Sequence, residues 1–249
     1  MATFDKLMEI RKRQGAGYMV LLDPDHLDKK DLARTAALCA ENGADVILFG
    51  GSFLLSTSFD WMVREVKGAV DIPVIVFPGP DLNQISAAAD AILFLSMISG
   101  RNPELLIGLQ VKAAPLLKAH GLEAISTGYM LVDSGHPTTV EYISNTKPMP
   151  RNKPEIAKAH ALAAEYLGMQ CLYLDAGSGA AQMVPEEMVR SVTESASLPL
   201  IVGGGIRRPE DAAARVAVGA SFIVTGNVLE ARREAGLIQE FAQAIHCVV

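Results

Sequence analysis

The most distinctive stretch for chemistry places one carboxylate between an apolar run and a turn of small residues. Asp175 follows Cys171-Leu-Tyr-Leu174 and precedes Ala176-Gly-Ser-Gly179. The apolar run predicts a buried strand, and the glycines predict a turn directly after it. Backbone N–H groups at such a turn bind anions, so this stretch is expected to form one wall of a phosphate site.

Two later stretches repeat this design of an apolar run that ends in glycine. One is Pro199-Leu-Ile-Val-Gly-Gly-Gly-Ile206 and the other is Phe222-Ile-Val-Thr-Gly-Asn227. Turn geometry alone would explain any single one of them, because glycine is common in turns. Three in the last third of the chain favour one shared phosphate site, with the backbone N–H groups of Gly204-Gly205 and Gly226-Asn227 as donors.

A second carboxylate, Asp23, ends the first apolar run of the chain and precedes Pro24-Asp25. Asp25 fits a turn followed by a helix cap. Asp23 is expected to point at the mouth of the fold, where a Mg²⁺ ion would bridge it to substrate phosphates. Ser52 ends the neighbouring run and would add a hydroxyl ligand, although a tight turn equally explains Gly50-Gly51-Ser52.

Short apolar runs alternate with helical patterns along the whole chain, which is typical of parallel strands joined by helices. Eight such units in 249 residues predict an α/β fold, a single (β/α)₈ TIM barrel over residues 1–249. In such barrels the site lies at the C-terminal ends of the strands, where the residues above would meet. The strands are expected at residues 18–22, 45–49, 73–77, 91–95, 123–133, 171–174, 199–203 and 221–225.

Two segments depart from this alternation. The segment after Phe77 has room for about two helical turns at most, at residues 82–89. Residues 134–153 are polar, show no clear period and carry Lys147, Arg151 and Lys153. A loop of that length is usually functional or mobile, so it is either a solvated loop or a lid that clamps a diphosphate.

The composition excludes several classes of protein. The net charge of -6 and the pI near 5.4 argue against a nucleic-acid partner, which would favour a basic patch. The three cysteines are far apart and have no metal spacing, which predicts a reducing, cytoplasmic setting. The charged N-terminal helix lacks the apolar stretch of a signal peptide, and no run is long enough to span a membrane.

An ordered set of motifs resembles the geranylgeranylglyceryl phosphate synthase family over nearly the whole chain. The motifs are YLDAGSG at 173–179, VGGGI at 202–206, TGN at 225–227, LLDPD at 21–25 and FGGS at 49–52. The stretch at 141–157 is similar to the second group of that family, which includes archaeal and Bacteroidetes-type members.

The resemblance implies a fold and a reaction. The family's barrel is modified, with its third helix replaced by irregular chain, which agrees with the short segment after Phe77. Its enzymes use Mg²⁺ to join sn-glycerol 1-phosphate to a polyprenyl diphosphate, here expected to be geranylgeranyl diphosphate, and form an ether bond. An apolar groove beside strands three to five would hold the prenyl tail. The family also forms dimers or hexamers, and its lipid substrate favours contact with a membrane surface.

The resemblance also implies roles for individual residues. Asp23 and Ser52 match the Mg²⁺ ligands, and Asp175 matches the residue that accepts the glycerol hydroxyl proton. First-group members carry Glu where this chain has Asp175, and Lys where it has Leu21. The residues that match the glycerol 1-phosphate site are Tyr173, Leu174, Asp175, Ala176, Gly177, Ser178, Gly179, Gly204, Gly205, Gly226 and Asn227.

The same residues also allow other functional interpretations. Isomerases and lyases of sugar or indole phosphates share the glycine loops after strands seven and eight, but they usually need a Lys or a second acid at other strand ends. A heptaprenylglyceryl phosphate synthase is an alternative within the same family. A non-catalytic barrel that binds a phosphorylated ligand is disfavoured by the two carboxylates, Asp23 and Asp175.

Overall fold

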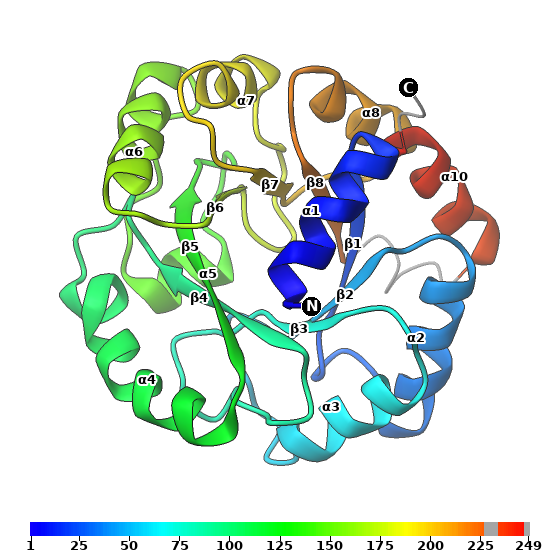
Figure 1. The fold of residues 1–249 in the computed structure, drawn as a ribbon. Helices are drawn as coiled ribbons and strands as arrows, with labels where there is room; N and C mark the ends of the chain where they lie inside the picture. Colours follow the sequence, from blue (N-terminus) through cyan, green and yellow to red (C-terminus); the bar gives the residue numbers. More distant parts are fainter. Residues whose placement is uncertain (227–233, 247–249) are drawn as a thin grey trace.

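Eight parallel strands close into a barrel in which each strand pairs with the next along the chain and β8 pairs with β1 (Figure 1). The structure is a computed structural model that describes residues 1–226 and 234–246. The barrel predicted from the sequence is therefore confirmed. The strands are β1 (Gly17–Leu22), β2 (Val46–Phe49), β3 (Val74–Val76), β4 (Ala91–Ser96), β5 (Glu123–Leu131), β6 (Cys171–Asp175), β7 (Leu200–Gly203) and β8 (Phe222–Thr225).

Helices surround the barrel and connect its strands. Their apolar faces and the outward side chains of the strands form the outer core, while the inward side chains of the strands fill the barrel. The described helices are α1 (Thr3–Gln14), η1 (Lys29–Asp31), α2 (Leu32–Glu41), α3 (Phe59–Gly68), the π-helical turn η2 (Glu104–Gly108), α4 (Leu109–His120), α5 (Thr139–Ser144), α6 (Pro154–Tyr166), α7 (Glu186–Thr193), α8 (Pro209–Ala217) and α10 (Ala235–Ile245).

Helix α1 crosses the N-terminal end of the barrel and closes it (Figure 1). Leu7 and Ile10 pack against the residues that fill the barrel. The backbone N–H groups of Thr3 and Phe4 donate to the Glu123 carboxylate at 2.5 and 3.0 Å, which satisfies two groups at the helix start. Because one end is sealed in this way, ligands can enter only at the C-terminal strand ends or through the wall.

The wall is open between β3 and β4, because β3 is short. The pairing of β3 with β4 covers only Ile75↔Ala91 and Val76↔Ile92, whereas β4 pairs with β5 from Ala91 to Ser96. Between β3 and β4 the described chain contains no helix. Residues 77–90 form irregular turns instead, as the sequence predicts. Because β3 is short, residues 93–96 of β4 have no partner on the β3 side among the described residues, and no helix covers this gap directly after β3.

The segment at 134–153 is more ordered than the sequence suggests. It contains the short helix α5, and Met149 forms a β-bridge with Val132 beyond the end of β5. The Thr138 hydroxyl accepts a hydrogen bond from the Glu141 N–H and so caps α5. A helix of 6 residues is too short to show a hydrophobic period, which is why α5 could not be predicted from the sequence.

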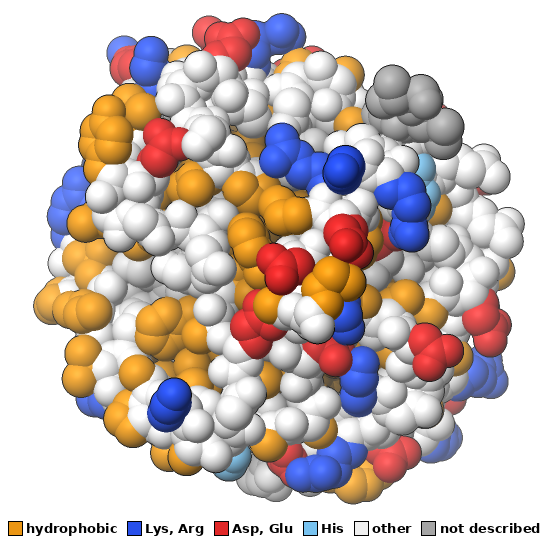
Figure 2. Space-filling model, viewed as in Figure 1, with side chains coloured by type: hydrophobic (Ala, Val, Ile, Leu, Met, Phe, Trp, Pro, Cys, Tyr) orange, Lys and Arg blue, Asp and Glu red, His pale blue; other side chains and the backbone are white. Residues whose placement is uncertain are grey.

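Hydrophobic side chains gather on the α4 and α6 side of the face seen in Figure 2. The exposed large apolar residues of these two helices are Val111, Leu116 and Tyr166, and Leu167 follows directly after α6. None of the helices in the described ranges is both long and apolar enough to cross a membrane.

Candidate functional site

A polar pocket of about 740 Å³ opens at the C-terminal ends of the strands. It is lined from the ends of β1, β2, β3, β6, β7 and β8 and from α5 and α10, so residues far apart in the sequence meet there. The polar residues in its lining are Asp23, Asp25, His26, Ser52, Thr139, Tyr173, Asp175, Ser178, Arg207, Arg208 and Thr225, and the glycines are Gly51, Gly179, Gly204, Gly205 and Gly226.

Asp175, the last residue of β6, is a buried carboxylate in this pocket, with 6% of its surface exposed. The Tyr129 hydroxyl donates to its Oδ2 at 2.6 Å, and the Gly177 N–H donates to its Oδ1 at 2.8 Å. Burial raises the pKa of Asp175, and the two hydrogen bonds oppose part of that rise. Each oxygen keeps a lone pair for a further donor, so the carboxylate can receive a proton from a bound hydroxyl.

An aromatic cluster of Phe77, Tyr129 and Tyr173 packs beside the Asp175 carboxylate. Tyr173 stacks on Phe77 with ring centroids 5.2 Å apart and contacts Tyr129 at 5.4 Å. Burial and the nearby Asp175 charge raise the pKa of Tyr129 well above its usual value. Tyr129 therefore stays protonated and donates to Asp175 throughout the physiological pH range.

Gly204 lets the turn after β7 approach Asp175. Its φ of +83° lies in the region that favours glycine, and a Cβ atom there would lie 2.6 Å from Asp175 Oδ1. The same atom would lie 2.7 Å from the backbone nitrogens of Ala176 and Gly177. Any side chain at this position would push the glycine turn away from the carboxylate.

Asp23 and Ser52 follow β1 and β2 and both line the polar pocket. Asp23 Oδ1 accepts the Asp25 N–H at 2.9 Å, and a Cβ atom on Gly51 would lie 2.7 Å from Asp23 Oδ2. Burial raises the pKa of Asp23. Only glycine at position 51 allows the two strand ends to come this close, and Ser52 follows directly.

This donor set fits magnesium. A carboxylate and a hydroxyl are hard oxygen donors, and Mg²⁺ is usually held by one or two protein ligands and by phosphate oxygens. In the part of the chain that the structure describes, no three His, Cys, Asp or Glu side chains cluster as a metal site. Asp23 and Ser52 would therefore hold the ion together with a phosphorylated ligand.

Asp25 holds a loop rather than capping a helix. Its carboxylate accepts the N–H groups of Leu55 at 2.6 Å and Ser56 at 3.0 Å, in the connection between β2 and α3. Helix η1 begins only at Lys29, too far along for an Asp25 cap. The interpretation of Asp25 as a cap is wrong, because the loop after β2 offers closer N–H donors.

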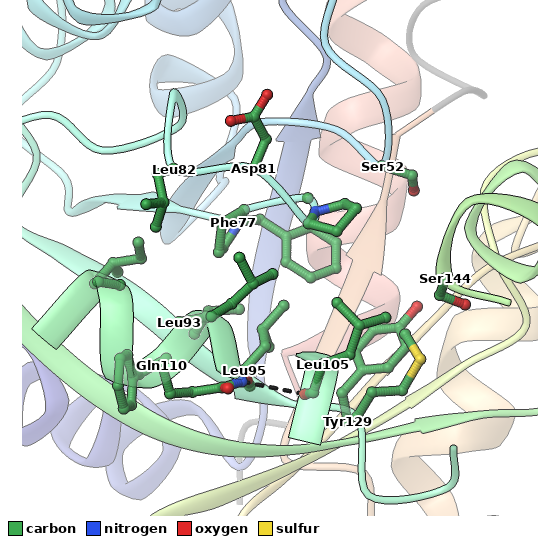
Figure 3. Close-up of a pocket in the computed structure, with 18 of the residues that line it drawn as sticks. Ser52, Phe77, Asp81, Leu82, Leu93, Leu95, Leu105, Gln110, Tyr129 and Ser144 are labelled. Carbon is green, nitrogen blue, oxygen red and sulfur yellow. Dashed lines mark hydrogen bonds between the residues drawn. The ribbon is translucent and has the colours of Figure 1, made fainter. Parts of the chain in front are cut away.

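An apolar groove starts beside the polar pocket and passes through the opening between β3 and β4 (Figure 3). It is a narrow slot of about 110 Å³. Its walls come from the irregular segment after β3, from β4 and from α4, and its apolar lining includes Phe77, Leu82, Ile85, Leu93, Leu95, Leu105, Leu109 and Ala113.

The groove and the pocket share three residues, Gly51, Ser52 and Phe77. Gln110 lies across the groove from Ser52 and Ser144 (Figure 3). Its amide nitrogen donates to the carbonyl oxygens of Leu95 and Leu105, which ties the π-helical turn to β4. A ligand can therefore place a polar head in the pocket and an apolar tail in the groove, with the junction at Ser52.

The chain is similar to known proteins over nearly its whole length. The sequence model of the PcrB family matches residues 8–245. The chain belongs to the PcrB family. It is 49% identical over 237 residues to the geranylgeranylglyceryl phosphate synthase of Chitinophaga pinensis, with 95% of this chain and 93% of that protein covered. It is 42% identical over 237 residues to the synthase of Korarchaeum cryptofilum, with 95% and 97% covered.

A solved structure of the same family agrees in fold. It is the (S)-3-O-geranylgeranylglyceryl phosphate synthase from Thermoplasma acidophilum in complex with its substrate sn-glycerol-1-phosphate. The TM-score is 0.93 and the identity 35%, with 99% of each chain covered. The resemblance seen in the sequence motifs and the expected TIM barrel are both confirmed.

Most of the residues expected in the site of this PcrB-family chain do line the polar pocket. They are Asp23, Ser52, Tyr173, Asp175, Ser178, Gly179, Gly204, Gly205 and Gly226. Leu174 and Ala176 point into the outer core instead, because successive side chains of a strand alternate between its faces. Gly177 acts through its N–H on Asp175. Asn227 lies outside the described residues.

The sequence motifs overlooked several residues that the PcrB fold brings to the site. Tyr129 lies within β5, and from the sequence its aromatic ring indicates only a core residue. Arg207 and Arg208 follow the glycine turn after β7 directly, and that position beside a phosphate-type turn is the signal that could have indicated them. Phe53 and Leu55 carry no signal in the sequence beyond their places after a strand, whereas Thr225 begins the TGN motif at 225–227.

Proposed function

We propose that this chain is a prenyltransferase that joins sn-glycerol 1-phosphate to a polyprenyl diphosphate. The observation that carries the proposal is that a polar pocket with a buried carboxylate meets a narrow apolar groove at Ser52 and Phe77. The primary hydroxyl oxygen of the glycerol bonds to C1 of the prenyl chain as the bond from C1 to the diphosphate oxygen breaks. The products are an ether-linked polyprenylglyceryl phosphate and diphosphate.

Asp175 accepts the proton of the attacking hydroxyl. Its raised pKa, caused by burial, makes it a better proton acceptor than an exposed carboxylate. The hydrogen bonds from Tyr129 and Gly177 fix the direction of its remaining lone pairs. The barrel holds the two reacting atoms together, which replaces an encounter in solution by a reaction within one complex.

The glycerol phosphate binds between the turns after β6, β7 and β8. Backbone N–H groups at these glycine turns provide an anion site. The relative from Thermoplasma acidophilum binds sn-glycerol-1-phosphate, which supports this ligand for the pocket.

Asp23 and Ser52 would hold a magnesium ion at the diphosphate end of the prenyl substrate. When bound, such an ion would neutralise the charge that develops on the departing diphosphate. The prenyl tail then lies in the apolar groove between the segment after β3 and α4. Curated relatives are named geranylgeranylglyceryl phosphate synthases, which supports a geranylgeranyl tail.

One assay tests the proposal. Purified protein is incubated with magnesium, labelled sn-glycerol 1-phosphate and prenyl diphosphates of increasing length, and ether products are extracted and identified by mass. An ether product with geranylgeranyl diphosphate is expected, and the sn-glycerol 3-phosphate control should be a poor substrate. If no tail length gives an ether, the proposed reaction is wrong.

We also propose that the chain assembles with copies of itself. Exposed apolar side chains on α4 and at the end of α6, Val111, Leu116, Tyr166 and Leu167, provide a surface for this contact. Size-exclusion chromatography with light scattering would reveal a dimer or hexamer. A monomer at all concentrations would refute assembly. The lipid product also favours transient contact with a membrane surface, which a vesicle flotation assay would detect.

A further inference from the structure

The loop between β6 and α7, residues 176–185, is held from outside by three arginines. They come from three parts of the chain: Arg151 from the segment before α6, Arg207 from the turn after β7, and Arg215 from α8. All three guanidinium groups donate to backbone carbonyl oxygens of this one loop. A charged donor to a carbonyl is a stronger hydrogen bond than a neutral one.

Arg207 holds the first part of the loop. Its Nη2 donates to the Ala180 carbonyl at 2.7 Å and its Nη1 approaches the Ala181 carbonyl at 3.4 Å. The same side chain lines the polar pocket. It therefore links the turn after β7 to the turn after β6, the two walls between which the glycerol phosphate is proposed to bind.

Arg151 and Arg215 hold the second part of the loop. Arg151 donates to the carbonyls of Met183 at 3.2 Å and Asp133 at 3.0 Å, so it ties the loop to the end of β5. Arg215 is 8% exposed and donates through Nε and Nη2 to the Val184 carbonyl at 3.2 and 3.0 Å.

These contacts give Arg151 a different role from the one expected of a lid that clamps a diphosphate. The guanidinium is occupied by two carbonyls, and Lys153 lies 3.7 Å from the Glu155 carboxylate. The segment at 134–153 therefore supports the loop: the Ser134 carbonyl accepts the Gln182 N–H at 3.1 Å.

The held part of the loop touches the pocket directly. Gly205, with a φ of +73°, packs so closely that a Cβ atom would lie 3.1 Å from the Met183 nitrogen and 3.2 Å from the Ala180 oxygen. Ser178 and Gly179, a few residues earlier in the loop, line the pocket. A shift of the loop at 180–184 would therefore move two walls of the pocket together.

We propose that Arg151, Arg207 and Arg215 are positioning residues that keep this pocket in the shape that binds glycerol phosphate. The inference rests on the proposed function and specifies how that site maintains its affinity. Arginine is required because its planar fork presents donors in a fixed geometry, whereas a lysine ammonium keeps the charge but lacks the fork. Positioning and simple attraction between charges thus predict different results for lysine.

The test uses single Arg→Lys variants at 151, 207 and 215 in the full chain. The KM for sn-glycerol 1-phosphate is expected to rise about tenfold in each, because one or two charged hydrogen bonds to the loop are lost. The KM for the prenyl diphosphate should stay within about twofold, since the hydrogen bonds that the three arginines make within the described residues reach neither Asp23 nor Ser52 nor the groove lining. Arg64→Lys is the matched control, because Arg64 pairs with Asp60 on the exposed face of α3.

Arg207→Gln separates positioning from charge. Glutamine removes the charge but keeps an amide donor for the Ala180 carbonyl, so it should bind glycerol phosphate at least as well as Arg207→Lys. If Arg207→Lys equals the unmodified protein while Arg207→Gln loses binding, charge alone acts and the inference is wrong. Amide exchange at 176–185 should rise in the lysine variants, and an unchanged exchange rate would also overturn it.

Calorimetry without any prenyl substrate distinguishes a failure of the proposed function from a failure of the positioning role. Binding of sn-glycerol 1-phosphate to the unmodified protein is expected, with weaker binding to each lysine variant. If the unmodified protein does not bind it, the proposed function fails. If the unmodified protein and all three variants bind it equally, only the positioning role fails. Arg207 is exposed, so its variant tests the inference even if Arg215→Lys does not fold.

Discussion

The two halves of the barrel mouth are built in opposite ways. Around β6, β7 and β8 the site consists of backbone turns that hydrogen bonds hold in place, with Gly204 against Asp175 and three arginines on the loop carbonyls. Around β3 and β4 it consists of a gap, formed because one strand is short and one helix is missing. A small, charged ligand needs fixed donors, whereas a long apolar tail needs only a dry slot of the right width.

This contrast predicts that changes in the polar half alter chemistry and affinity for the head group, while changes in the apolar half alter the choice of tail. Substitutions at the junction should affect both substrates. Four experiments test these expectations, from the largest effect to the smallest.

Asp175→Asn should have the largest effect. Without a carboxylate to accept the hydroxyl proton, kcat is expected to fall by about 10²–10⁴-fold. The amide has nearly the same size, so calorimetry should still detect binding of sn-glycerol 1-phosphate. Asp71→Asn, on the exposed surface after α3, is the control. Near-normal turnover in Asp175→Asn would exclude the proton-acceptor role.

Asp23→Ala removes a proposed magnesium ligand from the polar pocket. Loss of one magnesium ligand should remove roughly 3 kcal/mol of transition-state stabilisation, about a hundredfold in rate. Manganese binding in the presence of diphosphate, followed by electron paramagnetic resonance, should weaken in parallel. Asp28→Ala, an exposed neighbour in the same segment, should leave both unchanged. Unaltered manganese binding in Asp23→Ala would remove this residue from the metal site.

Leu109→Trp narrows the apolar groove from the α4 side. The larger ring should exclude long tails first, so kcat/KM for geranylgeranyl diphosphate should fall about tenfold relative to a shorter prenyl diphosphate. The KM for glycerol phosphate should not change. Lys118→Trp, at an exposed position of the same helix, is the matched control. An equal loss with every tail length would contradict a tail-specific groove.

Tyr129→Phe should give the smallest effect, a shift in pH dependence. Asp175 works only when deprotonated, so the rate falls as the pH drops through its pKa, and burial places that pKa above the usual value for Asp. The Tyr129 hydrogen bond lowers the pKa, so its removal should move the acid limb of kcat to higher pH. Tyr142→Phe, an exposed residue of α5, should leave the limb in place. A limb that stays put or moves to lower pH in Tyr129→Phe would disprove the coupling.

Much of the architecture can be predicted from the sequence because it depends on local patterns. Continuous apolar runs mark the buried parallel strands, and glycines after β6 and β7 mark turns that adopt positive φ angles. The irregular chain after β3 can also be predicted from the sequence, since residues 77–90 have room for about two helical turns at most.

What the sequence could not indicate depends on long-range contacts. Tyr129 reads as a core residue, and only the register of β5 on β6 brings its hydroxyl to Asp175. Arg151 and Arg215 read as surface charges, and only the folded chain turns them onto carbonyls of one loop. Asp25 looks like a helix cap, because nothing local shows that Leu55 and Ser56 lie within its reach.

The two-residue pairing of β3 with β4 has a consequence for how the barrel opens. A barrel in which all neighbouring strands are fully hydrogen-bonded has no exposed strand edge at which local unfolding could begin. In this barrel the short pairing of β3 with β4 provides such a place. Because the proposed tail would bind at the same place, its occupancy would stabilise this short pairing by mass action. The thermal unfolding temperature measured with different prenyl diphosphates would then rank the tails by affinity without any turnover.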